Sequence, residues 1–415
     1  MSGDPLSSYL NLADLLGDES VVRPEQLHRY AVDGLVPQVV VRPADRDGVA
    51  QALRWASTEG RAVFPRGGGT QLCLGNVPSR IDLVLDLSRC NRLLDYQPAD
   101  MTATVEAGIT LESLQQELAA KGQFVPLEAP LPERSTIGGI LAANASGPLR
   151  STYGLARDWL IGIGVASAAG VRTKAGGKVV KNVTGYDLNK LYTGSLGTLG
   201  VIMEATFKLA PLPPAWGALR AVFPSLQEGV GAARGLLSRV TAAQGVAVIN
   251  RPVARRLDQV PPLGEGEALA VAFYSGRSRA VERRLNEGVR WLREKGAAQV
   301  EPLDSAGSHH LLRALTDLGW TAETRPYLGL QVNVPPSAVG DVVAWTQEPG
   351  PLGGWDTGVI ADVAFGRVHL LWWAEGASEG PDERAVMEAI HRMRGSARGL
   401  SGWMLVEHCP LPVKR

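Results

Sequence analysis

A run of three glycines is the feature of this chain best suited to bind an anion. It lies in residues 64–71, after a short apolar stretch, and the loop consists of Pro65, Arg66, Gly67, Gly68, Gly69, Thr70 and Gln71. Glycine has no side chain and adopts positive φ without strain, so the loop can present successive backbone N–H groups to a phosphate. Three glycines also form ordinary tight turns, and the interpretation therefore depends on the segments that follow.

Four later segments share this preference for small and loop-forming residues. They are residues 133–147, 153–158, 181–191 and 194–202. In the first, Ser135 or Thr136 can cap a short helix whose small residues would let its backbone lie against a flat or phosphorylated ligand. A turn or a helix contact explains each segment when it is taken singly, so the argument rests on their order and spacing.

The sequence contains no nucleophile motif and no set of metal ligands in a recognised spacing. The three cysteines form no C-x-x-C pair, which argues against a zinc or iron–sulfur site within the chain and suits a reducing compartment. His309 and His310 lie on a predicted helix, where adjacent side chains face different sides, so we do not expect them to share a metal. No metal site is predicted, and the catalytic residues remain unknown from the sequence.

The composition bounds the class of protein. The chain has 415 residues, of which 45% are hydrophobic and 20% charged, as is typical of a globular protein with two or three domains. Lys+Arg and Asp+Glu number 42 each, so there is no overall basic field for nucleic acid. No apolar run reaches the roughly 18 residues that span a bilayer, and residues 1–16 lack the features of a signal peptide. We therefore expect a cytoplasmic protein.

Helices and strands are predicted around each of these segments. Asp45 and Thr110 can cap helices over residues 45–59 and 111–121. Alternating or apolar runs predict strands over residues 38–43, 82–87, 102–107 and 200–209, and a hairpin over 160–173. A linker, Pro211-Leu212-Pro213-Pro214, follows, because three prolines in four residues exclude a helix or a central strand.

The composition changes after the linker. Strands are predicted over residues 218–223, 246–249, 269–274, 327–334, 358–363, 368–373 and 402–406. Helices are predicted over residues 226–240, 277–295, 309–318 and 382–393. This alternation indicates an α+β sheet with helices on one face. Two domains are expected, residues 1–212 and residues 213–415.

The glycine-rich segments together resemble a known family. From about Tyr30 to Leu209 the chain is similar to the FAD-binding domain of the vanillyl-alcohol-oxidase/p-cresol-methylhydroxylase (PCMH) superfamily, and within it to the FAD-binding E subunits of bacterial glycolate oxidases. The residues that carry the resemblance are Pro65-Arg66-Gly67-Gly68-Gly69-Thr70, Ser135-Thr136-Ile137-Gly138-Gly139, Ala142-Ala143-Asn144-Ala145-Ser146-Gly147, Tyr153-Gly154, Arg157-Asp158, Lys181-Asn182, Gly185-Tyr186-Asp187-Leu188 and Gly197-Thr198-Leu199-Gly200-Val201-Ile202. It implies an α+β fold with a two-subdomain PCMH-type FAD-binding domain, its core at residues 30–210, and an α+β cap domain whose sheet is mostly antiparallel.

The resemblance also implies a set of FAD-binding residues. The backbone of residues 66–70 would bind the pyrophosphate, and Val201 and Ile202 would offer backbone groups on the adenine side. Because Thr70 stands where some relatives carry a flavin-linking histidine, the FAD is expected to be non-covalent. The complete set implied is Pro65, Arg66, Gly67, Gly68, Gly69, Thr70, Gln71, Thr136, Gly138, Gly139, Ala143, Ser146, Gly147, Tyr153, Gly200, Val201 and Ile202.

The second half of the chain departs from the family pattern. Related D-2-hydroxyacid dehydrogenases carry a histidine-rich metal and substrate motif late in the chain. The nearest stretch here, Gly366-Arg367-Val368-His369, lacks the second histidine and the adjacent acid. The Asn-Pro-Gly ending of relatives is also missing. No equivalent of the family's catalytic base is therefore evident.

The implied function is that of an FAD-dependent oxidoreductase acting on CH–OH groups. The chain would be the FAD-binding subunit of a glycolate (2-hydroxyacid) oxidase complex, with a second flavin subunit, an iron–sulfur subunit and a small hydroxyacid substrate. It would meet the inner membrane only through its partners. Two alternatives stay open: a free-standing hydroxyacid or sugar-alcohol dehydrogenase, and a non-catalytic flavin-binding scaffold. Lys181, Tyr186 and Lys190 could contact substrate or serve the fold.

Overall fold

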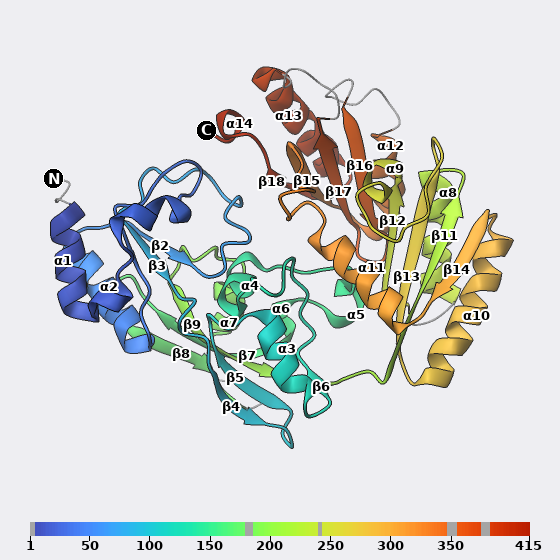
Figure 1. The fold of residues 1–415 in the computed structure, drawn as a ribbon. Helices are drawn as coiled ribbons and strands as arrows, with labels where there is room; N and C mark the ends of the chain where they lie inside the picture. The colour runs from blue at the N-terminus through green and yellow to red at the C-terminus, as the bar shows by residue number, and fades with distance from the viewer. Residues whose placement is uncertain (1–4, 179–185, 240–242, 347–354, 375–381) are drawn as a thin grey trace. The chain divides into compact units, whose positions relative to one another are not determined.

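The computed structural model describes residues 5–178, 186–239, 243–346, 355–374 and 382–415. These residues form two compact units (Figure 1). The first unit comprises Met1–Ser146 and Leu155–Leu212, and the second comprises Gly147–Gly154 and Pro213–Arg415. Lys181 and the rest of residues 179–185 lie outside the described residues.

A small parallel sheet opens the first unit. Its strands are β1 (Val39–Val41), β3 (Leu83–Asp86) and β2 (Val63–Arg66), paired in the order β1-β3-β2. Helices α1 (Pro5–Leu16) and α2 (Arg46–Thr58) pack beside it, and their apolar side chains share a core with Leu83 and Leu85. Asp45 caps α2 as predicted, accepting hydrogen bonds from the backbone N–H groups of Asp47 and Gly48.

A five-stranded antiparallel sheet forms the other part of the first unit. Its order is β4 (Leu93–Gln97), β5 (Thr102–Glu106), β9 (Val201–Lys208), β7 (Leu160–Ala166) and β8 (Arg172–Gly176). One face packs through Val105, Ala205 and Phe207 against α3 (Leu111–Ala119) and α4 (Ile137–Ala143). The shorter elements are β6 (Gln123–Phe124), α6 (Ala156–Trp159), α7 (Leu188–Tyr192) and β10 (Ala210–Pro211).

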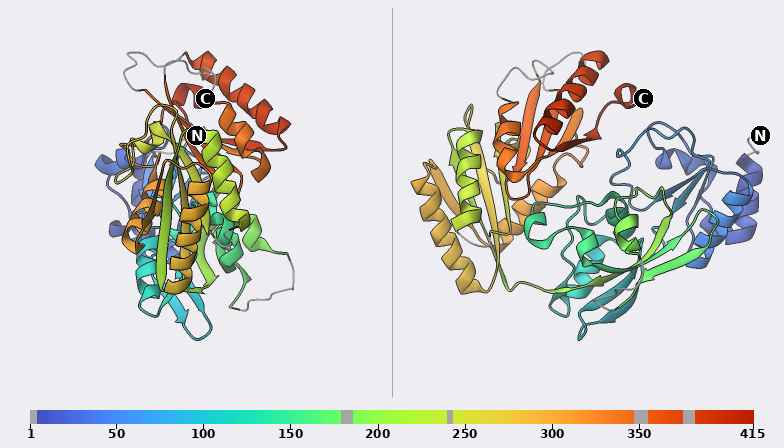
Figure 2. Two further views of the ribbon diagram at one scale, coloured as in Figure 1. Left: turned by 90° about the vertical axis from the view of Figure 1, so that its right-hand side faces the viewer. Right: turned by 180° about the vertical axis from the view of Figure 1, so that it is seen from behind.

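The second unit is built on one eight-stranded sheet (Figure 2). Every strand pair in it is antiparallel, as predicted for the cap domain. In order, the strands are β14 (Gln299–Leu303), β11 (Ala215–Phe223), β13 (Ala268–Gly276), β12 (Gly245–Asn250), β16 (Asp356–Asp362), β17 (Arg367–Trp373), β15 (Leu328–Asn333) and β18 (Trp403–His408).

Helices cover both faces of this sheet, and the expectation of helices on one face was wrong. One face carries the largest core, formed with α8 (Leu226–Arg239), α10 (Ser278–Glu294), α12 (Val339–Ala344) and α13 (Glu383–Gly399). The other face packs on α9 (Arg251–Ala254), α11 (Ser305–Asp317) and residues next to α5 (Arg150–Tyr153). The second core includes residues of β11, β12, β13, β16 and β17 but none of β15 and β18.

Among the described residues, no helix combines the length and the apolar character needed to cross a bilayer.

Candidate functional site

One cavity in the first unit collects three of the glycine-rich segments. Residues from the end of β2, from α4 and its cap, and from the loop that enters β9 line it together. Of the predicted residues, the cavity is lined by Pro65, Arg66, Gly67, Thr136, Gly138, Gly139, Gly200 and Ile202. Leu87, Ala107, Ala142, Leu196 and Gly197, which were not predicted individually, complete the lining.

The glycines are needed because these segments approach through their backbones. A Cβ on Gly67 would lie 2.0 Å from Oγ1 of Thr136, and a Cβ on Gly68 would lie 1.7 Å from the carbonyl oxygen of Arg134. A Cβ on Gly138 would lie 2.8 Å from the Cβ of Ala107. Real Cβ atoms do not approach this closely, so only glycine permits the packing. Five glycines are among the thirteen residues that line the cavity, so part of its wall is backbone, which fits a ligand bound through peptide N–H groups.

The remaining predicted residues are distributed around this cavity or away from it. Thr70 lies beside it and hydrogen-bonds Ser135 through the two hydroxyl groups, at 2.9 Å, which ties the glycine loop to the helix-capping segment. Val201 points into the core beneath the parallel sheet. The remaining predicted residues outside its lining are Gly68, Gly69, Gln71, Ala143 and Ser146, together with Gly147 and Tyr153, which belong to the second unit.

Arg66 gives the cavity a positive charge. Its guanidinium lies 4.7 Å from the centre of the Tyr30 ring and donates to the carbonyl oxygen of Arg29 at 3.2 Å. Burial lowers the pKa of Arg66, while Asp86 and Tyr30 oppose that effect. An arginine guanidinium nevertheless stays charged at neutral pH. Bare N–H groups beside one fixed cation suit a diphosphate, and the cavity thus fits the pyrophosphate of FAD.

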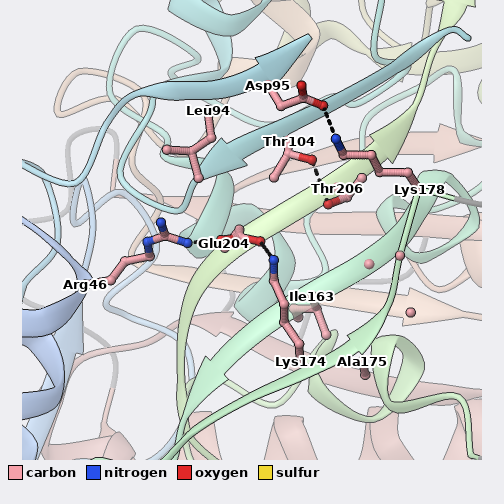
Figure 3. A pocket seen from close by; sticks show the side chains of 13 residues that line it. Arg46, Leu94, Asp95, Thr104, Ile163, Lys174, Ala175, Lys178, Glu204 and Thr206 are labelled. Atoms are coloured by element: carbon pink, nitrogen blue, oxygen red, sulfur yellow. Dashed lines mark hydrogen bonds and ion pairs between the residues drawn. The ribbon is translucent and has the colours of Figure 1, made fainter. Parts of the chain in front are cut away.

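The same unit has a second hollow, on the outer face of its five-stranded sheet (Figure 3). There the buried carboxylate of Glu204 is paired with Arg46 and, at 2.6 Å, with Lys174. Lys178 pairs with Asp95 at 2.7 Å, and the hydroxyls of Thr104 and Thr206 bond each other at 3.0 Å. Because each of these charged groups already has a partner, the hollow is explained by the protein's own ion pairs.

Polar residues gather on one face of the second sheet, on the neighbouring strands β16, β17, β15 and β18. Residues directly opposite in antiparallel strands project to the same face. Strand register places Asp362, Arg367, Asn333 and Trp403 in one row across β16, β17, β15 and β18. The next row is Ile360, His369, Gln331 and Leu405. The residues between them in sequence, such as Val332 and Val368, point to the opposite face and its core. Ile360 belongs to the second core, and we call the polar residues of these two rows, Asp362, Arg367, Asn333, His369 and Gln331, together with Glu407, the polar face.

His369 is held by a buried carboxylate. Its Nδ1 lies 2.9 Å from Oε2 of Glu407, whose exposed fraction is 6%. Burial by itself raises the pKa of Glu407, but the charges of His369, His408 and Arg367 and the His369 hydrogen bond lower it overall. An ionised carboxylate only accepts, so Nδ1 carries the proton. In the neutral imidazole Nε2 is then the acceptor, and no described residue hydrogen-bonds it. This is the arrangement of an oriented general base.

Two guanidinium groups surround one carboxylate at the end of the same face. Arg367 lies 3.9 Å from Asp362 and donates to the carbonyl oxygen of Gly147 at 3.0 Å. Arg150 stacks on the ring of Phe365 at 3.8 Å and also acts on Asp362. Burial raises the pKa of Asp362, and Arg367 is the strongest opposing influence.

The sequence did not reveal the acid that accompanies His369. The family motif predicts an acid next to the histidine in the sequence. In the structure the acid is Glu407 of β18, 38 residues from His369. Its only signal in the sequence was that Glu407 occurs near the end of a predicted strand.

The other candidates lie elsewhere. His309 packs on Trp216 with ring centroids 5.0 Å apart, and His310 is exposed. Tyr186 is exposed, and Lys190 pairs with Asp187 at 2.9 Å. Cys73, Cys90 and Cys409 form no disulfide with one another. Across the part of the chain that the structure describes, no three His, Cys, Asp or Glu residues are placed to hold a metal ion.

His408 makes a prediction about stability. It is 5% exposed and packs edge-on against Trp320, and burial lowers its pKa from 6.5 to about 4. The unfolded chain binds this proton more readily, so stability falls as the pH drops from 6.5 toward 4. The full difference corresponds to about 3 kcal/mol. Urea unfolding at several pH values measures this loss of unfolding free energy between pH 6.5 and pH 4. In His408→Phe the loss should be smaller by about 3 kcal/mol, whereas in His310→Gln it should equal that of wild type. Equal pH dependence in wild type and His408→Phe would contradict it.

Comparison with known proteins identifies the first unit. Residues 37–176 match the family described as FAD binding domain. Glycolate oxidase subunit GlcD of Bacillus subtilis is 32% identical over 270 residues, 63% of this chain and 56% of the relative. Glycolate oxidase subunit GlcE of Escherichia coli is 39% identical over 144 residues, 34% of this chain and 41% of the relative. The chain thus spans about half the length of these relatives. The match of residues 37–176 and the similarity to these relatives confirm the expected cofactor and family resemblance.

The fold is confirmed by a solved structure. That of p-cresol methylhydroxylase with substrate bound superposes with a TM-score of 0.73 and 16% sequence identity, covering 99% of this chain and 90% of the other. At this identity the similarity concerns the fold alone, which is the predicted PCMH type.

Proposed function

We propose that this chain is an FAD-dependent oxidoreductase that oxidises the CH–OH group of a small 2-hydroxy acid. The observation that carries the proposal is the His369–Glu407 pair, at 2.9 Å, in a chain with an FAD binding domain. The names of the GlcD and GlcE relatives support the substrate class. A scaffold without turnover would have no need of a buried carboxylate that orients a histidine.

The first unit, corresponding to the expected domain of residues 1–212, would hold the cofactor. Backbone groups of residues 66–70 would bind the pyrophosphate beside Arg66, and the capped segment at Thr136 would border the flavin. Val201 and Ile202 would contribute backbone groups on the adenine side. The other predicted contacts, Gln71, Gly138, Gly139, Ala143, Ser146, Gly147, Tyr153 and Gly200, remain part of the proposal.

The second unit, corresponding to residues 213–415, would supply the side chains that act on substrate. The guanidinium of Arg367, on the same face as His369, would bind the α-carboxylate. Nε2 of His369 would accept the hydroxyl proton while the carbonyl double bond forms, and Glu407 would stabilise the resulting imidazolium. Bound FAD supplies the two-electron acceptor that takes the α-hydrogen as hydride. The product is the 2-oxo acid.

Flavin attachment provides a direct test of the cofactor assignment. Thr70 has no nucleophilic ring nitrogen to bond the flavin, so FAD should be bound non-covalently. Precipitating the purified, flavin-loaded chain with acid should release all flavin into the supernatant, as measured by its visible spectrum. Flavin that stays in the protein pellet would contradict this, and a chain that takes up no flavin when FAD is added would overturn the proposed function.

We further propose that the chain works as a subunit of a glycolate-oxidase-type complex. It would pass electrons from a flavin to an iron–sulfur partner, together with a second flavin subunit, on the cytoplasmic side of the membrane. Affinity purification of the tagged chain from its native cell should recover both partners. A chain that is purified alone, and whose flavin is reduced by substrate and reoxidised without partners, would instead be a free-standing dehydrogenase.

A further inference from the structure

Asn333 is a buried amide whose side chain makes no hydrogen bond with the residues that the structure describes. It ends β15 and is 8% exposed, yet neither its Nδ2 nor its Oδ1 has a hydrogen-bonding partner among the described residues. Leaving both ends of a buried amide unpaired costs free energy, and native proteins rarely do so without a reason. The missing partner is therefore expected to be a ligand.

The register of the sheet shows where this amide points. Asn333 lies opposite Arg367 on one side and opposite Trp403 on the other, so its side chain belongs to the polar face. The row that contains Asn333 is next to the row that contains His369. The two rows are two residues apart along each strand, a distance of about 7 Å. Trp403 is 56% exposed, so this end of the row is open to solvent. A small molecule held at His369 can therefore extend to Asn333.

The chemistry of the amide selects the partner. An amide offers an acceptor and two donors, and a hydroxyl group both donates and accepts, so one hydroxyl can pair with either end. An alkyl group satisfies neither end. A second carboxylate could only accept, so it would leave the amide oxygen unpaired.

We propose that Asn333 determines specificity by binding a second hydroxyl group of the substrate. The preferred substrate is then a 2-hydroxy acid with a further hydroxyl two or three carbons along its chain. This inference rests on the proposed function, because His369 is taken to bind the reacting hydroxyl. A site built to bond a hydroxyl discriminates strongly against an analogue that lacks it, since the buried amide is then left unpaired.

Binding of unreactive analogues tests this role without turnover. 2-Hydroxy-2-methylbutanoate and 2,4-dihydroxy-2-methylbutanoate have no α-hydrogen and cannot be oxidised at that carbon. Isothermal titration calorimetry would measure both with the FAD-loaded full chain and with Asn333→Leu, which has nearly the same shape and removes both unpaired groups. We expect the dihydroxy acid to bind wild type about tenfold more tightly than the monohydroxy acid. That advantage should disappear in Asn333→Leu, while the monohydroxy acid binds as before.

The outcomes separate this inference from the proposed function. Equal affinity of the two acids for wild type, an advantage that persists in Asn333→Leu, or binding of neither acid would overturn the role of Asn333. Asn333→Ser, a smaller polar variant, repeats the test if Asn333→Leu does not fold. If the selectivity is found but 2,4-dihydroxybutanoate fails to reduce the flavin, the proposed oxidation fails while Asn333 keeps its binding role.

Discussion

Replacing His369 by glutamine is expected to slow reduction of the bound flavin by a 2-hydroxy acid by about 10²–10⁴-fold, the range of general base catalysis. Glutamine can still donate a hydrogen bond to Glu407, which preserves the buried pair, but its amide does not accept a proton. The rate should be measured in a single turnover, by mixing the FAD-loaded chain with substrate without oxygen.

His310→Gln is the matched control, because it makes the same chemical change at an exposed histidine on α11. It should reduce its flavin at the wild-type rate. His369→Gln should also retain FAD as wild type does, since His369 belongs to the second unit. A His369→Gln variant that reduces its flavin at the wild-type rate would remove His369 from the reaction.

Replacing Gly68 by alanine should weaken the binding of FAD. The new Cβ would lie 1.7 Å from the carbonyl oxygen of Arg134, a backbone atom that cannot turn aside. The loop that carries the pyrophosphate contacts must then move. Overpacking of this kind costs about 1–3 kcal/mol, and at the upper end FAD would bind roughly 100-fold more weakly. Equilibrium titration with FAD, followed by flavin fluorescence, measures this change.

Gly177→Ala is the control in the same unit, since a Cβ at Gly177 meets nothing within 4 Å. It should bind FAD as wild type does. Circular dichroism of both variants shows whether the unit stays folded. Gly68→Ala with wild-type affinity for FAD would mean that the loop does not form the pyrophosphate site.

The cofactor half of the site could be predicted because its requirements are local. Gly67, Gly68 and Gly138 must be glycine at their positions, because each packs against a neighbouring segment that leaves no room for a Cβ. Caps such as Asp45 were predictable for the same reason. Short-range rules did not predict β14, whose residues are mostly half-exposed and show no clean alternation.

The polar face could not be predicted, because it depends on strand register. Glu407 meets His369 only because β18 pairs with β15 and β15 with β17. The residues next to Glu407 and His369 in the sequence do not indicate that these two side chains pair. Residues Gly147–Gly154 illustrate the same limit, since they lie between two cofactor segments in sequence yet belong to the second unit. Because this segment belongs to the second unit, Arg150 contacts Phe365 and acts on Asp362 of the polar face.

The central claim is that this chain oxidises a hydroxy acid with its own flavin. The most direct test mixes the FAD-loaded chain, without oxygen, with glycolate and with longer 2-hydroxy acids, and follows flavin absorbance together with the 2-oxo acid formed. We predict that the flavin bleaches and that one equivalent of 2-oxo acid appears per flavin. Flavin that stays bound but oxidised with every acid, in the isolated chain and in its purified complex, would contradict the account.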